Sequence, residues 1–179
     1  MDIVDMRTLD NAQRLQAAHM LVDELPIGWP TLADATREVG ERLQEEGAAF
    51  FAAVHDNAVI GWCGILPSYF GKVFELHPLV VRKDWQRKGV GTKLVNAVEQ
   101  EAKQRGGLTL WLGADDERPG GETSFANVDL YDDLPRRLRE FNPGTHQAGF
   151  YLKLGFHIMG VMPDANGPGK PDIYFAKKL

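Results

Sequence analysis

The sequence predicts an α/β domain in which helices pack on a mixed sheet. Short apolar runs bounded by turn residues indicate strands, and longer segments with apolar residues at helical spacing indicate helices. These helices fall between strands along the chain, which is the order that builds a layered α/β architecture. A length of 179 residues fits one domain of ordinary size, so we expect residues 1–179 to form a single domain.

The first third of the chain predicts a strand, two helices and a hairpin. Apolar residues recur at helical spacing after Asp10, and Thr31 can cap the second helix through its hydroxyl oxygen. Turn residues at 55–58 separate two apolar runs and so predict a hairpin. The expected elements are a strand at 2–7, helices at 10–25 and 31–46, and strands at 48–54 and 59–66.

A proline interrupts the next predicted strand, at about 72–82. Pro78 cannot donate to the hydrogen-bond ladder of a sheet, so pairing is expected to lapse near the middle of this strand. An amphipathic stripe then predicts a helix over 85–105, which a pair of glycines ends. Residues 108–112 are mostly apolar and predict a buried strand.

The last third of the chain begins with an acidic, glycine-bearing loop at 113–133. Gly155 suits the left-handed position that follows the end of a helix. The remaining expected elements are short helices at 134–141 and 146–154 and strands at 156–162 and 172–177, the two strands being joined by a long turn.

Composition argues against several classes of function. An apolar content of 44% with 25% charged residues is typical of a globular protein, and no stretch approaches the ~18 consecutive apolar residues of a membrane span. A net charge of −5 argues against a nucleic-acid partner and suits a cationic substrate better. The amino-terminal residues lack the apolar core of a signal peptide, so we expect a cytoplasmic protein with no membrane partner.

Neither the cysteine nor the histidines predict a metal or covalent centre. Cys63 lies in an apolar run, so we expect a buried structural thiol rather than a nucleophile that carries an acyl group. The histidines outside the 72–82 strand are His19, His55, His146 and His157, and they show no metal-ligand spacing. No metal is therefore expected.

The most informative segment joins the strand at 72–82 to the helix that follows it. Arg87 to Thr92 contains Gly89 and Gly91, which allow a close approach of the backbone. Amide groups at a helix start lack intrahelical partners and carry the positive end of the helix dipole, so they can bind an anion. A glycine pair here is also how ordinary strand-to-helix turns are made, so this segment alone leaves both interpretations open.

Two flanking blocks favour the anion-binding interpretation. FELHPLVV, residues 74–81, precedes the loop, and FYLKLGF, residues 150–156, lies downstream of it. Together the three segments resemble the GCN5-related N-acetyltransferase superfamily, in which the loop holds the pyrophosphate of acetyl-coenzyme A. The resemblance implies acetyl-coenzyme A as co-substrate and a mixed, mostly antiparallel sheet, splayed at strands 4 and 5, with helices on both faces.

Acyl transfer from a thioester to an amine needs a deprotonated amine, a polarised carbonyl and a thiolate that can leave. Glu75 could accept the proton of the amine, directly or through water, or be a solvated strand residue. The backbone N–H of Leu79 could polarise the thioester oxygen, unless a bulge absorbs Pro78. Tyr151 could protonate the thiolate, with Phe150 taking the core side of the helix, or it could itself be a core aromatic.

Two further features suit a cationic acceptor. His77 shares a face with Glu75 if the strand is regular, although a single strand histidine is more often a hydrogen-bonded structural group than a base. The loop at 113–133 concentrates negative charge that would steer a polycation, unless its acids are simply solvated. Those acids are Asp115, Asp116, Glu117, Glu122, Asp129, Asp132 and Asp133, with Arg118 as the one basic residue among them.

Longer blocks are similar to aminoglycoside 6'-N-acetyltransferases of the small chromosomal type. Besides FELHPLVV they are GTKLVNAVEQEAKQRGGLTLWLGADDE, NVDLY, FYLKLGFHIMGVMPDANG and KPDIYFAKKL. The first ~70 residues match weakly, as expected where substrate loops vary. An asparagine that often contacts the cofactor seven residues before the tyrosine is replaced here by Gly144.

This closer resemblance implies a role for each candidate residue. Glu75 would be the base, Tyr151 the acid, and the Leu79 amide the partner of the carbonyl oxygen. The implied cofactor-binding residues are Leu79, Val80, Val81, Arg87, Lys88, Gly89, Val90, Gly91 and Thr92. The implied substrate-binding residues are Trp29, Glu75, His77, Asp115, Asp116 and Asp172. Relatives of this type are often dimers, so a homodimer is expected.

The implied function is transfer of acetyl from acetyl-coenzyme A to the 6'-amine of an aminoglycoside. Direct attack in a ternary complex is expected, because no placed cysteine or serine nucleophile is evident. Two alternatives stay open from the sequence. The acceptor could be another amine, such as a polyamine, an amino sugar or a protein amine, or the chain could be a coenzyme A binding module without catalysis.

Overall fold

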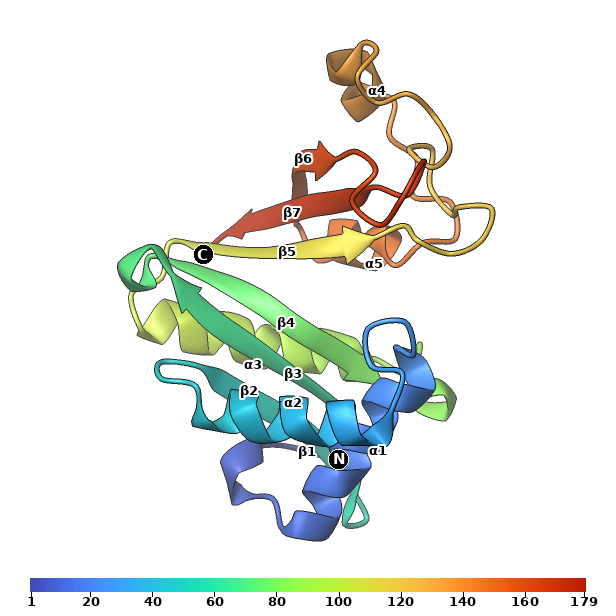
Figure 1. The fold of residues 1–179 in the computed structure, drawn as a ribbon. Helices are drawn as coiled ribbons and strands as arrows, with labels where there is room; N and C mark the ends of the chain where they lie inside the picture. Colours follow the sequence, from blue (N-terminus) through green and yellow to red (C-terminus); the bar gives the residue numbers. More distant parts are fainter. The chain divides into compact units, whose positions relative to one another are not determined.

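The computed structural model describes residues 1–179 and contains the predicted strands and helices in the predicted order (Figure 1). The chain divides into two compact units, one formed by Met1–Leu110 with Leu179 and the other by Trp111–Lys178. No helix has the length and apolar character needed to span a bilayer.

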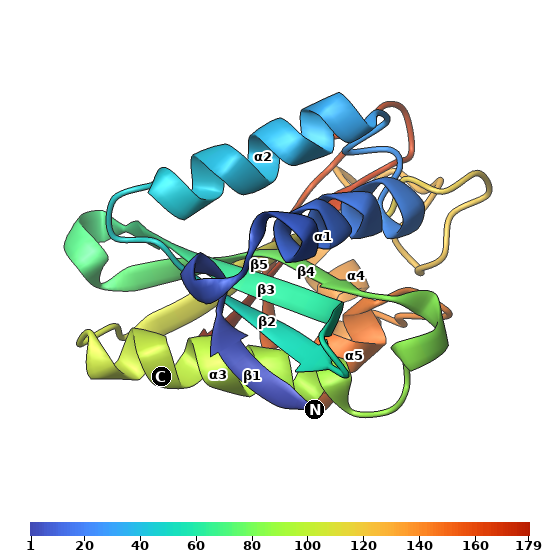
Figure 2. The ribbon, with the colours of Figure 1, turned by 90° about the horizontal axis from the view of Figure 1, so that it is seen from below.

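The first unit contains four paired strands and three α-helices. Strands β1 to β4 pair in sequence order, and every pair is antiparallel. Helices α1 and α2 cover one face of this sheet and α3 covers the other (Figure 2). The bounds are β1 Asp2–Asp5, α1 Asn11–Glu24, α2 Leu32–Gln44, β2 Ala49–His55, β3 Ala58–Ser68, β4 Val73–Val81 and α3 Val90–Gln104.

Side-chain caps start both α1 and α2. The Asp10 carboxylate accepts a hydrogen bond from the Gln13 amide, and the Gln13 side chain accepts one from the Asp10 amide, which is a capping box. The Thr31 hydroxyl accepts from the Asp34 amide, so the predicted cap of α2 is confirmed.

Both faces of the first sheet are tightly packed. Trp62 is fully buried against α1, and its indole Nε1 donates to the Ala17 carbonyl oxygen over 3.1 Å. On the other face, a side chain at Gly61 would place its Cβ 3.1 Å from a methyl of Leu94, so α3 lies directly on the β3 backbone. These contacts fix the position of β4, which borders β3.

A bulge interrupts β4 where the sequence places its proline. Leu76 lies opposite Ile65 and Leu79 lies opposite Cys63, so His77 and Pro78 together face the single residue Gly64. The His77–Pro78 peptide bond is cis. The predicted lapse in pairing is therefore confirmed, and it takes the form of a bulge that absorbs Pro78, which is the alternative that the sequence leaves open.

The bulge changes which face of the sheet the side chains of β4 meet. Glu75 lies opposite Leu66 and Val80 lies opposite Trp62, and both Leu66 and Trp62 belong to the core beneath α1 and α2. Glu75 and Val80 therefore share a face, although residues five positions apart in a regular strand would lie on opposite faces. Val81 lies opposite Gly61 and points toward α3 instead.

Helix α3 begins later than predicted. The apolar stripe predicts a start at residue 85, but Lys83–Trp85 forms a 3-10 turn and α3 starts at Val90. Arg87 and Gly89 between them have left-handed backbones, with φ of 58° and 81°. Because a left-handed residue cannot continue a right-handed helix, the residues between Trp85 and Val90 form a loop.

The second unit contains the end of one strand, a strand pair and two short helices. Strands β7 and β6 are antiparallel, and β7 lies between β5 and β6. The bounds are β5 Thr109–Asp115, α4 Leu134–Arg139, α5 Ala148–Lys153, β6 His157–Met162 and β7 Asp172–Lys178. Its core is aromatic, with Phe125, Phe156 and Phe175 each almost fully buried. β5 runs three residues beyond the predicted 108–112, so Asp115 ends a strand rather than lying within the loop.

Candidate active site

In the first unit, Glu75 and His77 lie on the face of β4 that carries α2. His77 Nε2 lies 3.6 Å from the Glu38 carboxylate, and the rings of His77 and Trp29 are 5.9 Å apart. Arg42 donates to the same Glu38 oxygen over 2.7 Å. The structure thus brings together three of the predicted substrate-binding residues, namely Trp29, Glu75 and His77.

Burial lowers the pKa of His77 below its ordinary value of 6.5. The negative charges of Glu75 and Glu38 oppose this shift, whereas the positive charge of Arg42 adds to it. The side chain is one-third exposed, at 33%. A neutral imidazole that still reaches solvent can accept a hydrogen bond or a proton from a polar ligand.

The backbone of the candidate cofactor loop has the form that an anion site needs. Gly89 is the N-cap residue of α3, and with no side chain it makes no cap, unlike Asp10 and Thr31 at the starts of α1 and α2. The first amides of a 15-residue helix therefore have no side-chain cap from the N-cap residue. A Cβ at Gly89 would meet nothing within 4 Å, so the space above the loop is open.

Basic side chains surround this loop. Arg87 and Lys88 are exposed, and the Lys88 ammonium lies 5.1 Å from the centre of the Trp85 ring. Val90 is buried beneath the loop and anchors it to the core. Open space, uncapped amides and positive charge fit a pyrophosphate, which is the group expected for Arg87 to Thr92.

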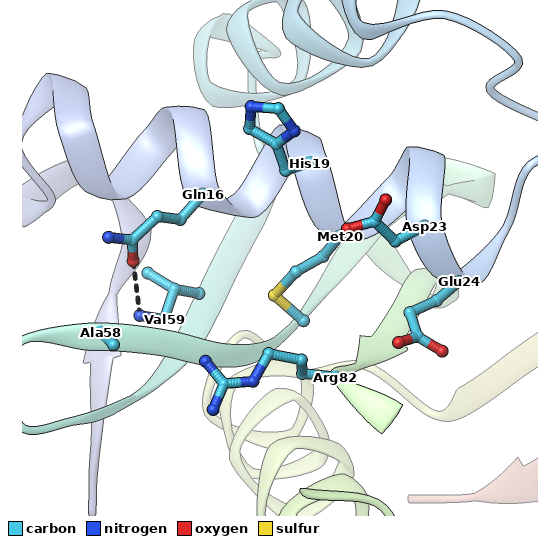
Figure 3. Close-up of a pocket in the computed structure, with 8 residues that line it drawn as sticks. All are labelled: Gln16, His19, Met20, Asp23, Glu24, Ala58, Val59 and Arg82. Atoms are coloured by element: carbon cyan, nitrogen blue, oxygen red, sulfur yellow. Dashed lines mark hydrogen bonds between the residues drawn. The ribbon is translucent and has the colours of Figure 1, made fainter. Parts of the chain in front are cut away.

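A cleft of about 360 Å³ lies between α1 and the ends of β3 and β4 (Figure 3). Much of its polar lining is already engaged, since Gln16 accepts from the Val59 amide, Glu24 accepts from the Lys83 amide, and Arg82 pairs with Asp84. The residues that line it are Gln16, His19, Met20, Asp23, Glu24, Ala58, Val59 and Arg82. None of the predicted site residues is among them.

In the second unit, Asp115 is held from two sides. Its carboxylate accepts a hydrogen bond from the Asn166 amide of the β6–β7 turn, and its carbonyl oxygen lies 3.0 Å from His146 Nε2. The Asp115 side chain remains exposed. An exposed carboxylate in a fixed position suits an ammonium ligand.

Asp172 and Tyr174 lie near Asp115 on neighbouring strand β7. A Cβ at Gly113 would come within 2.9 Å of the Asp172 carboxylate, so the missing side chain leaves room for that group. Desolvation raises the pKa of Tyr174, and the charges of Asp172 and Asp115 raise it further. Desolvation and the charge of Asp115 likewise raise the pKa of Glu117. Asp115 and Asp172 therefore place negative charge close together here, while the wider negative field expected of the loop stays a prediction.

Asp116 differs from its neighbour. It is completely buried, and its two carboxylate oxygens accept hydrogen bonds from the Glu122 and Thr123 amides, both over 2.8 Å. A carboxylate with both oxygens bound to the backbone organises its loop. We therefore infer that Asp115 presents its negative charge to solvent, whereas Asp116 has a structural role.

Tyr151 lies on α5 and is 5% exposed. Its ring packs against Phe150, Phe156 and Phe175, with the closest ring centres 5.2 Å apart. Phe150 is only half-buried, so the expectation that Phe150 takes the core side of the helix is wrong. Both residues of the pair contribute to the core, and Tyr151 is the more buried.

Cys63 is fully buried in β3, and burial raises the pKa of its thiol. A thiol of this kind is not a nucleophile at neutral pH, in agreement with the structural role predicted for it.

Sequence reasoning missed four residues that hold these groups in place. Glu38 and Arg42 lie on α2, one turn apart on a helix whose face toward β4 had no chemical motif. His146 lies just before a short helix and Asn166 lies in a turn, and no sequence motif marks either residue as part of the site. Only the i, i+4 spacing of Glu38 and Arg42 could have been recognised, as a helix ion pair.

Comparison with known proteins gives consistent results. The pattern of the Acetyltransferase (GNAT) family matches residues 12–120. A structure of an aminoglycoside 6'-N-acetyltransferase complexed with coenzyme A is 35% identical, with a TM-score of 0.89. The aminoglycoside 6'-N-acetyltransferase from Enterococcus faecium is 35% identical with a TM-score of 0.88, and an aminoglycoside 6'-acetyltransferase type Ii is 31% identical with a TM-score of 0.77.

Each of these three alignments covers 99% of this chain and 97% of the other. No curated protein matches the sequence. The likeness over the whole chain confirms the predicted fold class, an α/β fold with a mixed sheet and packed helices.

Proposed function

The chain belongs to the Acetyltransferase (GNAT) family, and we propose that it acetylates the 6'-amino group of aminoglycosides with acetyl-coenzyme A. The observation that carries the proposal is the full-length similarity, at 31–35% identity, to three structures of aminoglycoside 6'-acetyltransferases. The exposed, fixed carboxylate of Asp115 supports a polycationic acceptor.

The donor half of the proposal rests on the loop from Arg87 to Thr92. Its uncapped helix start and exposed basic residues would bind the pyrophosphate of acetyl-coenzyme A. Leu79, Val80 and Val81 would lie along the pantetheine arm. The similar enzyme that was solved with coenzyme A supports this part of the proposal.

The chemistry proposed is direct attack in a ternary complex. Glu75 would take the proton from the ammonium, directly or through water, and the freed amine would form a bond to the thioester carbon. Although a bulge absorbs Pro78, we keep Leu79, the first residue after the bulge, as the group whose N–H would donate to the oxygen that becomes negative. As the carbon–sulfur bond breaks, Tyr151 would give its proton to the departing thiolate, and the nitrogen would lose its second proton to solvent, from which Tyr151 regains one, so that free thiol and amide are the products.

The acceptor half of the proposal concerns two separate groups of residues. Trp29 and His77 in the first unit would contact the ring that bears the amine. Asp115 and Asp172 in the second unit would bind further ammonium groups of the drug. We expect the protein to be cytoplasmic and to act as a homodimer. Light scattering on the purified protein measures its molar mass and so tests the dimer.

A thiol-release assay tests the function. Acetyl-coenzyme A is incubated with a panel of aminoglycosides that carry a 6'-amine, and one with a 6'-hydroxyl serves as control. Release with the 6'-amine set alone supports the proposal. Thiol release with polyamines or peptides instead would indicate another acceptor. No thiol release from a protein that still binds coenzyme A would indicate a binding module without catalysis.

A further inference from the structure

The last residue of α1 is linked to the loop that precedes the cofactor site. The Glu24 carboxylate accepts a hydrogen bond from the Lys83 amide over 2.7 Å and another from the Gln86 side-chain amide over 3.2 Å. Gln86 Nε2 also donates to the Val81 carbonyl oxygen over 2.9 Å. One carboxylate therefore connects the end of α1, the end of β4 and the residue immediately before Arg87.

The backbone of the loop has few other restraints, although the Trp85 ring packs against His55 and Arg82 pairs with Asp84. Within it, the backbone hydrogen bonds are two turn contacts, from the Trp85 amide to the Arg82 oxygen and from the Gln86 amide to the Lys83 oxygen. Two of its residues, Arg87 and Gly89, have left-handed backbones that no neighbouring helix or strand enforces. Such a segment opens locally at low cost unless side chains hold it.

The charge of Glu24 opposes the binding of a polyanion. A carboxylate beside a pyrophosphate site repels the ligand, so charge alone predicts that its removal would tighten binding. The hydrogen bonds act in the opposite direction, because a loop already in its binding form loses less freedom when the ligand arrives. Charge repulsion lowers the affinity for the polyanion and loop ordering raises it, so a measurement of binding can separate the two effects.

We propose that Glu24 is a positioning residue that holds the pyrophosphate loop in its binding conformation before acetyl-coenzyme A arrives. The inference rests on the proposed function, since it takes residues 87–92 as the pyrophosphate site. It adds a residue from the weakly matching first ~70 positions, a region in which variable loops are expected. Glu24 itself does not touch the reacting atoms.

The adjacent Asp23 provides a matched control. It lines the same cleft as Glu24 and is exposed, and it does not share the contacts of Glu24 with Lys83 and Gln86 (Figure 3). Replacing Asp23 by Ala removes the same charge from almost the same place and leaves the loop contacts intact. A difference between the two variants therefore reports the hydrogen bonds and not the charge.

The experiment compares wild type, Glu24→Ala, Glu24→Gln and Asp23→Ala. Isothermal titration calorimetry measures the Kd for coenzyme A, and hydrogen exchange in the free protein measures the opening of residues 82–89. We expect Glu24→Ala to weaken binding roughly tenfold and to speed exchange, because a charged hydrogen bond is lost. Glu24→Gln keeps an acceptor for the Lys83 amide, so its Kd for coenzyme A should lie between those of wild type and Glu24→Ala. Asp23→Ala should bind coenzyme A as tightly as wild type or slightly more tightly.

Steady-state kinetics add a second readout. The KM for acetyl-coenzyme A should rise in Glu24→Ala while kcat changes little, since the reacting groups are untouched. Replacing Gln86 by Ala should reproduce the effect, and the double variant with Glu24→Ala should be no worse than either single one.

Three outcomes overturn the inference. The first is a Glu24→Ala variant that binds coenzyme A as tightly as wild type with unchanged exchange at 82–89. The second is an equal loss of binding in Asp23→Ala. The third is full additivity between the Glu24 and Gln86 substitutions. If wild type itself fails to bind coenzyme A, the proposed function falls, and the loop restraint is still judged by exchange in the free protein.

Discussion

The imidazole of His146 joins the main chain of Asp115 to the start of α5. Its Nδ1 accepts a hydrogen bond from the Ala148 amide, so Nδ1 carries no proton, and its Nε2 must donate to the Asp115 carbonyl oxygen 3.0 Å away. The ring is 5% exposed. A buried histidine of defined tautomer thus connects the strand end that bears Asp115 with the helix that bears Tyr151.

Two substitutions separate the halves of this link. His146→Asn keeps an acceptor near the position of Nδ1 and loses the donor to Asp115, whereas His146→Gln keeps a donor that reaches Asp115. Loss of one buried hydrogen bond should raise the KM for the aminoglycoside about fivefold in His146→Asn, and less in His146→Gln. Equal KM values in both variants and wild type would show that the link does not position Asp115.

Neutralising the two adjacent acids should have different consequences. Asp115→Asn should raise the KM for the aminoglycoside about fivefold with little change in melting temperature, because the exposed carboxylate is proposed to bind an ammonium. Asp116→Asn places an amide against two backbone N–H groups and should lower the free energy of unfolding by about 1–3 kcal/mol. Steady-state assays and urea denaturation measure the two effects, and a reversed pattern would contradict the assignment.

Tyr151→Phe tests the general acid. Removing the hydroxyl should lower kcat by about 10²-fold and leave the Kd for coenzyme A nearly unchanged. The ring contacts with Phe156 and Phe175 need only the aromatic body, so the variant should remain folded. A variant with the turnover of wild type would remove Tyr151 from the mechanism.

The charges around His77 predict the direction of a titration. Glu38→Gln removes a charge that raises the pKa of His77 and leaves Arg42, whose charge lowers it, so the pKa should fall further. NMR titration of the ring protons measures this value. Glu45→Gln is the control, since Glu45 also pairs with Arg42 but does not approach His77. A rise in the pKa in Glu38→Gln would contradict the geometry.

The same histidine makes stability depend on pH. Its pKa is lowered by burial in the folded protein, whereas the unfolded chain titrates near 6.5, so below that value the unfolded state binds the proton first. The free energy of unfolding should therefore fall as the pH drops from 6.5 to the folded pKa, and this loss is complete below it. Urea denaturation across this range should show a flatter profile for His77→Gln than for wild type.

The sequence predicts those parts of the fold that depend on local chemistry. The Thr31 cap and the interruption at Pro78 each follow from one residue type whose hydrogen bonding is fixed. The start of α3 cannot be predicted from local chemistry. Trp85 fits the apolar stripe, and Arg87 has a left-handed backbone although it is not a glycine, the residue type that usually indicates one.

Long-range contacts lie beyond what local patterns can indicate. Glu24 meets Lys83 across 59 positions, and His146 meets Asp115 across 31. Neither pair leaves a periodic or spacing signal, since the partners become neighbours only when the elements pack. The resemblance to a known family supplied the candidate residues Glu75 and Tyr151, whereas the groups that hold the loops around them emerge from the packed structure alone.

The bulge in β4 has a consequence for protein engineering. Residues 73–77 and 79–81 are two half-strands out of phase, so the usual rule of alternate positions fails across Pro78. A substitution scan of this strand should treat the halves as independent modules. Removing one residue between them would leave a single residue opposite Gly64 and so restore a regular ladder, while Glu75 stays opposite Leu66 and Val80 opposite Trp62, so both halves would keep the faces that they have now.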